Sequence, residues 1–303
     1  MADWAAAHGV DLTVVGPEAY LNQGIVDAFE GRGLKVVGPT RSAAAIESDK
    51  AFAKELMARA SIPTAAFVVC DSPAEARAAV RRMGAPVVVK ATGLAAGKGV
   101  TVAMSVDEAL RAVSLLMEER IFGQAGERVV VEEYLAGEEA SVLAFVDGER
   151  VLAMEPAQDH KAIFDGDRGP NTGGMGAYSP APVVTRAVAD DVKSKILEPV
   201  VAAMQREGRP YRGILYAGLM ITAGGPKVVE FNCRFGDPEA QAVLPRLRSD
   251  LVEPLLATVD GGLDRVRLEW DPRACVTVVL ASRGYPGHHE TGFVITGLDK
   301  AAR

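Results

Sequence analysis

The stretch VVEFNCRFGDPE occupies residues 228–239 and predicts a buried strand that ends in a polar loop. Its valines and Phe231 suit a packed sheet. Side chains alternate along a strand, so Glu230 and Asn232 share one face while Phe231 points into the core. A carboxylate and an amide oxygen on one face form an all-oxygen site that suits Mg²⁺ or Mn²⁺ bridging substrate phosphates. An edge strand with a solvated polar face is the alternative.

Arg234 continues the polar face of this strand. Its planar guanidinium group offers a fork of donors to a phosphate or a carboxylate. The sequence therefore places an anion-binding group beside the predicted metal site.

The composition argues against several classes of protein. The chain has 303 residues, of which 49% are apolar and 24% charged, so we expect two or three globular domains. The net charge of −7 argues against a nucleic-acid-binding surface. The three cysteines lie far apart and fit a reducing cytosol better than a disulfide framework or a zinc site. Because no apolar run is long enough to cross a membrane, we expect a cytoplasmic protein without a membrane partner.

The order of apolar runs predicts an α/β fold. Residues 11–16, 25–33 and 34–38 read as strand, helix and strand, the order that begins an open α/β sheet. We expect further strands at 67–70, 87–91, 99–104, 129–133, 140–146, 151–154, 218–222, 227–232 and 275–281. We expect helices at 2–8, 40–60, 73–83, 106–119 and 185–207.

A glycine-rich segment, GLAAGKG at residues 93–99, joins two of the predicted strands. Gly97 and Gly99 would let backbone N–H groups approach an anion, and Lys98 adds charge, so the segment could cover ATP phosphates. Its spacing fits neither a Walker A loop nor a dinucleotide fingerprint, and a plain hairpin turn is the alternative. Lys90 ends the preceding strand, where a lysine either binds phosphate as a point charge or extends to the surface.

Two other polar segments are candidates for binding. Residues 132–135 end a strand and could present backbone groups to an adenine edge, with Glu138 near a ribose; a solvated acidic turn is the alternative. Residues 165–175, DGDRGPNTGGM, show no secondary-structure pattern, and such loops often bind substrates. His160 is either an acid–base group or a structural histidine. No spacing suggests a Ser-His-Asp or Cys-His arrangement, so catalysis by a protein nucleophile is not expected.

Taken together, these segments resemble the phosphoribosylamine–glycine ligases, a family of ATP-grasp enzymes in purine biosynthesis. The resemblance follows the family's order along nearly the whole chain and rests on VVGPEAYL, SDKAFAKELM, VVVKATGLAAGKGV, VVVEEYLAGEEAS, QDHK, GPNTGGMGAYSPAPVV and VVEFNCRFGDPEAQ. The pairing of NTGGMGAYSPAP with EFNCRFGDPE is highly specific.

The resemblance implies an ATP-grasp fold preceded by a partial open α/β domain. It divides the chain into an N-terminal α/β domain (1–62), a small subdomain (63–134), a large subdomain (135–265) and the start of a C-terminal domain (266–303). The family's opening strand, its first glycine-rich loop and most of its closing lobe have no counterpart, so we expect a chain truncated at both ends.

The resemblance also implies roles for individual residues. ATP would contact Lys50, Lys90, Gly97, Lys98, Gly99, Glu132, Glu133, Tyr134, Leu135 and Glu138. Glu230 and Asn232 would hold Mg²⁺ or Mn²⁺. The substrates would contact Asp159, Lys161, Asn171, Thr172 and Arg234. Lys90, Arg234 and Asp237 would serve catalysis.

The implied reaction joins glycine to 5-phosphoribosylamine at the expense of ATP, through a glycyl phosphate. We expect a monomer that acts on these small molecules. Two alternatives stay open at this point: another carboxylate–amine ligase of the same fold, or a fragment that binds nucleotide without catalysis.

Overall fold

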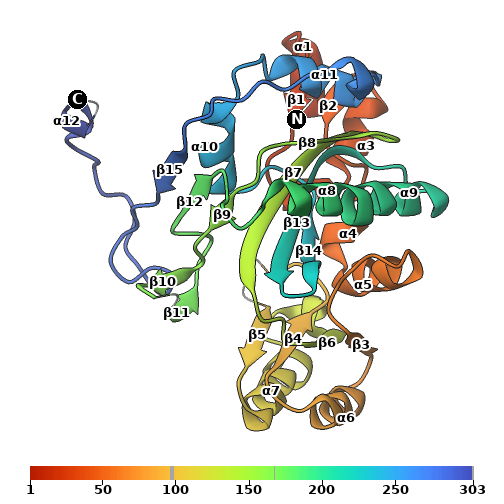
Figure 1. Ribbon diagram of the computed structural model, residues 1–303, viewed down its shortest axis with the longest axis vertical. Coiled ribbons are helices and arrows are strands. Elements are labelled where there is room, and N and C mark those ends of the chain that lie inside the picture. Colours follow the sequence, from red (N-terminus) through yellow and green to blue (C-terminus); the bar gives the residue numbers. More distant parts are fainter. Residues whose placement is uncertain (96–98, 167, 302–303) are drawn as a thin grey trace.

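The computed structural model describes residues 1–95, 99–166 and 168–301. It shows a mixed α/β protein built around two four-stranded sheets (Figure 1). The predicted fold class is confirmed. No helix within the described ranges is long and apolar enough to cross a membrane. The four domain boundaries given above stay a prediction.

The N-terminal unit carries the short parallel sheet that the sequence predicts, in which β1 (Thr13–Val14) pairs with β2 (Val36–Val37). Its helices are α1 (Ala2–Ala7), α2 (Glu18–Asn22), α3 (Ile25–Glu30), α4 (Ala45–Ser48) and α5 (Lys50–Arg59).

The single helix expected over 40–60 is wrong. Asp49 has an extended backbone between α4 and α5, and its side chain accepts hydrogen bonds from the N–H groups of Ala51 and Phe52 at 3.0 and 3.1 Å. This N-cap begins a new helix at Lys50. The break therefore places a predicted phosphate ligand on the first turn of α5.

The first four-stranded sheet has the antiparallel order β3-β6-β4-β5. Its strands are β3 (Phe67–Cys70), β4 (Val87–Ala91), β5 (Val100–Ala103) and β6 (Val129–Glu133). Its helices are α6 (Pro73–Met83), α7 (Val106–Val113), the π-helix η1 (Ser114–Glu118) and the 3₁₀-helix η2 (Gly123–Gly126). The glycine-rich segment joins β4 to β5, and the Ala91 N–H donates to the Gly99 carbonyl at 2.8 Å.

Strand alternation in this sheet separates a core face from a binding face. Val87, Val89 and the corresponding valines of β6 pack in one cluster with α6 and α7, which cover this face (Figure 1). Val88 and Lys90 alternate with them along β4 and lie on the opposite face. In the register of the sheet, Val88 pairs with Glu132 and Lys90 with Val130. The pattern VVVK therefore positions a lysine on the face opposite α6 and α7.

The second four-stranded sheet is also antiparallel, with the order β14-β13-β7-β8. Its strands are β7 (Glu138–Asp147), β8 (Val151–Ala153), β13 (Arg212–Thr222) and β14 (Gly225–Asn232). The predicted helix over 185–207 is α8 (Arg186–Val192), the π-helix η3 (Lys193–Leu197) and α9 (Glu198–Arg206) in succession. This long helix crosses the sheet (Figure 1) and shares one apolar core with the sheet and the N-terminal unit.

A third sheet, β15-β12-β9, lies beside the second one (Figure 1). It consists of β9 (Gln158–Asp159), β12 (Gly176–Ser179) and β15 (Cys275–Val278). The expectation that 165–175 has no secondary structure is wrong in part, because β11 (Arg168–Asn171) pairs with β10 (Ala162–Phe164). The remaining elements are α10 (Glu239–Val243), η4 (Leu244–Arg246), α11 (Val252–Asp260), η5 (Leu263–Arg265) and α12 (Leu298–Ala301).

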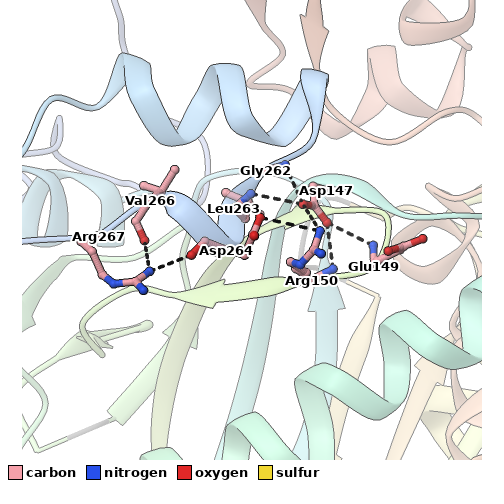
Figure 2. Close-up of polar contacts among 8 residues, drawn as sticks. All are labelled: Asp147, Glu149, Arg150, Gly262, Leu263, Asp264, Val266 and Arg267. Atoms are coloured by element: carbon pink, nitrogen blue, oxygen red, sulfur yellow. Dashed lines mark hydrogen bonds and ion pairs between the residues drawn. The ribbon is translucent and has the colours of Figure 1, made fainter.

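Asp147, at the end of β7, ties the β7–β8 turn to the segment after α11 (Figure 2). Its Oδ1 accepts from the N–H groups of Glu149 and Arg150 at 3.2 and 2.8 Å. Its Oδ2 accepts from the N–H groups of Gly262 and Leu263, both at 3.3 Å. One buried carboxylate thus satisfies four backbone donors and fixes two loops to each other.

Candidate active site

A cleft of about 1220 Å³ runs between the first and second four-stranded sheets and reaches α5 and the N-terminal unit. Every predicted site residue within the described ranges lines this cleft. They are Lys50, Lys90, Gly99, Glu132, Glu133, Tyr134, Leu135, Glu138, Asp159, Lys161, Asn171, Thr172, Glu230, Asn232, Arg234 and Asp237. Gly97 and Lys98 lie outside the described residues. Segments up to 187 residues apart in the chain, from Lys50 to Asp237, are therefore brought to one site.

Glu132 lies at the floor of the cleft between two lysines. It is 2% exposed and forms ion pairs with Lys54 of α5 and Lys90 of β4. The Lys54 ammonium group also donates to Thr64 Oγ1 at 2.7 Å, and Lys90 donates to the Val229 carbonyl at 3.2 Å. Burial lowers the pKa of Lys54 to about 8, although the Glu132 carboxylate acts to raise it. Glu132 thus holds two ammonium groups beside the cleft.

Glu230 is a carboxylate surrounded by the cationic side chains of the cleft. Burial opposes its ionisation, yet the surrounding cations hold the pKa of its carboxyl group below the ordinary value. These cations are Lys161, Lys90, Lys50 and Arg234. Among the described residues, no donor lies within hydrogen-bonding distance of the Glu230 carboxylate, and no cation lies within ion-pair distance. Its two oxygens are therefore available to a ligand.

The arrangement on β14 agrees with strand alternation. Phe231 is 2% exposed and packs in the apolar core, whereas Glu230 and Asn232 are partly exposed and line the cleft. In the β13–β14 register, Glu230 is opposite Gly218 and Asn232 is opposite Tyr216. The predicted inward and outward residues of this strand are confirmed.

Arg234 follows β14 and is held by protein groups on three sides. Its Nε lies 3.4 Å from Glu18 Oε2, and its Nη2 lies 3.7 Å from Glu47 Oε1. Its Nη1 donates to the Phe235 carbonyl at 3.2 Å. Burial would lower the pKa of this guanidinium group, but Glu47 and Glu18 raise it above the ordinary value. The side chain is therefore a fixed cation at the wall of the cleft.

The side of the cleft near β9 and β10 holds the residues predicted to contact substrates. Burial raises the pKa of Asp159 to about 6, although Lys161 acts to lower it. Lys161 forms an ion pair with Glu139 at 3.0 Å. Thr172 Oγ1 donates to the Lys161 carbonyl at 2.9 Å and accepts from the Gly174 N–H at 2.9 Å. These bonds order the loop after β11 against β10.

His160 and Asp237 have partners of their own. The backbone N–H of His160 donates to the Gly176 carbonyl at 3.0 Å, and the imidazole ring packs at 41° to the ring of Tyr178. Asp237 Oδ1 accepts from Gln241 Nε2 at 2.6 Å. Both residues line the cleft, and both alternatives for His160 stay open.

Comparisons with known proteins identify the family. The phosphoribosylglycinamide synthetase ATP-grasp (A) domain matches residues 48–240, and the N domain of the same enzyme matches residues 1–47. A phosphoribosylamine–glycine ligase of Vibrio cholerae is 56% identical over 296 residues, which are 97% of this chain and 69% of that protein. This chain belongs to the phosphoribosylglycinamide synthetase family. The resemblance found in the sequence is confirmed.

Solved structures of ATP-grasp proteins share the fold of this chain. The phosphoribosylamine–glycine ligase of Thermotoga maritima is 38% identical with a TM-score of 0.76, over 84% of this chain and 64% of that one. The chain thus spans less than two thirds of that relative. The biotin carboxylase domain of a Hydrogenobacter thermophilus 2-oxoglutarate carboxylase, solved with MgADP and bicarbonate, is 19% identical with a TM-score of 0.66 over 86% of this chain and 56% of that one, and shows the shared fold alone.

The site residues of this chain fit a metal bound mainly through substrate phosphates. ATP-grasp ligases use ATP as a substrate with Mg²⁺ or Mn²⁺. Within the described residues, no group of three or more His, Cys, Asp or Glu side chains could hold a metal by itself. Glu230 and Asn232 instead offer one carboxylate and one amide oxygen at the cleft, and Mg²⁺ is commonly held by few protein ligands plus phosphates and water. The donor set therefore fits the predicted metal.

Sequence reasoning missed several residues of the site. Lys54 pairs with Glu132, and Glu18 and Glu47 flank Arg234. Tyr216 donates to Glu239 at 2.7 Å, and both side chains line the cleft from β13 and α10. A charged residue on the apolar face of an amphipathic helix, as at Lys54, is the one signal that could have found part of this set.

Proposed function

We propose that the chain joins glycine to 5-phosphoribosylamine, forming glycinamide ribonucleotide, ADP and phosphate, as a monomer in the cytoplasm. The observation that carries the proposal is a cleft in which four cations lie around the open carboxylate of Glu230, near the end of β14. Such a site neutralises the charge of a nucleotide that transfers its γ-phosphoryl group.

The reaction needs two steps because a carboxylate is a poor electrophile. A glycine carboxylate oxygen attacks the γ-phosphorus of ATP, and the bond to ADP breaks. The amine of phosphoribosylamine then attacks the carbonyl carbon of the glycyl phosphate, phosphate leaves with its bonding electrons, and the new amide nitrogen loses a proton. The protein contributes positioning and charge neutralisation.

We assign the ATP phosphates to Lys50 and Lys90, together with the backbone around Gly99. A bound Mg²⁺ or Mn²⁺, held by Glu230 and Asn232, would neutralise phosphate charge. Lys90 already has a fixed direction, because Glu132 and the Val229 carbonyl hold its ammonium group. Glu132 thereby orients Lys90, which we assign to the ATP phosphates. It also lies next to the segment assigned to adenine.

We assign adenine to the connector from β6 to β7, through the backbone of Glu133, Tyr134 and Leu135, and the ribose to Glu138. The connector is fixed at its start, where the Glu133 side chain pairs with Lys227 at 3.0 Å and its N–H donates to the Ala66 carbonyl at 2.9 Å. Its remaining groups face the same cleft as the phosphate ligands.

We assign the meeting point of the two substrates to the opposite wall. Arg234 would bind the glycine carboxylate or the acyl phosphate through its fork, and Asp237 lies close along the chain. The remaining substrate contacts would come from Asp159, Lys161, Asn171 and Thr172.

Phosphate release tests this function directly. The purified chain is given ATP and Mg²⁺ with glycine, with freshly generated phosphoribosylamine, with both, or with neither. Release that requires both substrates supports the ligase. Binding of ADP without any release would instead favour a nucleotide-binding chain, and release with a different acid would favour another ligase of this fold.

A further inference from the structure

Glu47 is a buried carboxylate that reaches from α4 to the end of β14. It is 8% exposed, and its Oε2 accepts from the Cys233 N–H at 2.6 Å. Its Oε1 lies 3.7 Å from Arg234 Nη2. One carboxylate therefore holds the backbone just before Arg234 and the guanidinium group of Arg234 at the same time.

The contacts of Arg234 leave a defined part of its fork free. A guanidinium group has five N–H donors. Three of them face Glu18, Glu47 and the Phe235 carbonyl. One N–H on each terminal nitrogen then has no partner among the described residues, and guanidinium N–H groups bind carboxylates and phosphates.

We propose that Glu47 is a positioning residue for Arg234: it fixes the guanidinium group so that the two remaining N–H donors meet the carboxylate, or the acyl phosphate, of the reacting acid. This inference rests on the proposed ligase function. Both carboxylates that flank the guanidinium group lie within residues 1–47, which match the family's N domain. The N-terminal unit thereby orients a catalytic group of the ATP-grasp domain.

The charge of Glu47 makes this role sensitive to pH. Burial raises the pKa of Glu47 to about 7, although Arg234 and the Cys233 N–H act to lower it. The titratable and charged groups around it are Glu18, Lys50, Tyr211, Glu230, Cys233 and Arg234. An ionised Glu47 attracts Arg234, whereas a protonated one does not. Its contribution to the rate should therefore disappear as the pH falls through this value.

The Glu47→Gln variant tests the role of the charge. A glutamine keeps an oxygen that can accept from the Cys233 N–H but brings no negative charge to Arg234. We expect kcat to fall about tenfold well above the pKa of Glu47, with KM for ATP changed by less than about twofold. The ratio of the wild-type kcat to the variant kcat should approach one well below that pKa. A ratio that stays constant across this pH range, or equals one throughout, would overturn the proposal.

The matched control is Glu207→Gln, which removes the carboxylate of an exposed ion pair with Arg59 outside the cleft. It should leave kcat and its pH dependence unchanged. If Glu47→Gln fails to fold, Glu47→Asp keeps the charge but withdraws it from Arg234. We then expect a smaller fall in kcat that persists above the pKa, and an unchanged kcat would contradict the proposal.

A readout that does not need turnover separates this inference from the ligase function. The readout is the NMR spectrum of ¹⁵N-arginine-labelled protein. The Nε–H signal of Arg234 is assigned as the signal that disappears in the Arg234→Lys variant. Glu47→Gln should shift or broaden that signal, while Glu207→Gln should not. An unmoved signal would overturn the positioning role. Absence of phosphate release by the wild type would instead overturn the ligase, and the arginine signal would still decide the role of Glu47.

Discussion

Two carboxylates of the second sheet, one on β7 and one on β14, show how differently this protein uses a buried or partly buried negative charge. Asp147, after β7, is saturated by four backbone N–H groups (Figure 2). Glu230, on β14, has no described donor within hydrogen-bonding distance and is neutralised by cations farther away. A saturated carboxylate holds two loops together, whereas an unsaturated one among cations has capacity for a metal and its phosphates. We therefore expect mutations at these two residues to have opposite effects on stability and activity.

Glu230→Gln should have the largest effect on activity. Loss of the carboxylate removes the predicted metal ligand and one negative charge from among four cationic neighbours, so we expect ligase turnover to fall by at least about 100-fold. The free energy of unfolding should change by only about 1 kcal/mol, because no described hydrogen bond is lost. Phosphate release and urea unfolding measure the two effects. A variant that loses much of its free energy of unfolding but keeps its turnover would contradict the comparison.

Asp147→Asn should show the reverse pattern. The neutral amide has one acceptor oxygen in place of two. Two of the four backbone donors therefore lose their acceptor and face the amide NH₂ group, and the other two lose a charged partner, so we expect unfolding to become easier by about 2–3 kcal/mol. Turnover per folded molecule should stay within about twofold of the wild type, since Asp147 lies outside the cleft. A large fall in turnover with unchanged stability would show that the loops also act on the site.

The role of Asp147 in stability can also be tested through the pH dependence of the free energy of unfolding. Burial opposes ionisation of Asp147, but the backbone N–H groups of Arg150, Glu149, Leu263 and Gly262 together hold its pKa below the ordinary value of 3.8. A depressed pKa contributes stability that is fully present above the unfolded-state value and is lost as the pH falls through the folded-state value. The unfolding free energies of the wild type and Asp147→Asn should therefore converge in acid. Parallel curves down to the lowest measurable pH would contradict this assignment.

Much of the fold follows from the sequence because local patterns decide it. The bounds of β3, β4, β6 and α6 agree with those predicted, since each is an apolar run or a helical period between clear breaks. The break at Asp49 was missed because the helical spacing of apolar residues continues across it. Its side chain caps the next helix only because the backbone of Asp49 is extended, which the spacing does not indicate. The β10–β11 hairpin was missed because a polar, glycine-rich segment carries no apolar period.

The candidate site divides in the same way. The polar residues that line the cleft were found, because strand alternation and a family resemblance both indicate them. Their protein partners were not found. Lys54 and Glu132, or Glu47 and Arg234, are far apart in the chain and meet only through tertiary packing. Single-sequence patterns contain no information about such pairs, so the orienting residues appear only in the structure.

Arg150→Ala should have the smallest effect of the series. The Arg150 guanidinium lies 3.8 Å from both Asp147 Oδ2 and Asp264 Oδ1, and its side chain is 50% exposed (Figure 2). Exposed ion pairs contribute little, so we expect the free energy of unfolding to fall by less than about 1 kcal/mol, measured in urea. A loss as large as that of Asp147→Asn would mean that the side chain, and not the backbone, holds Asp147.

Binding of Mn²⁺ in the presence of ADP, followed by electron paramagnetic resonance, tests the central claim most directly because it needs no turnover. The wild type and Asp147→Asn should bind the ion alike, and Glu230→Gln should bind it at least about tenfold more weakly. Equal binding by the wild type and Glu230→Gln would contradict the assignment of the open carboxylate on β14 to the metal.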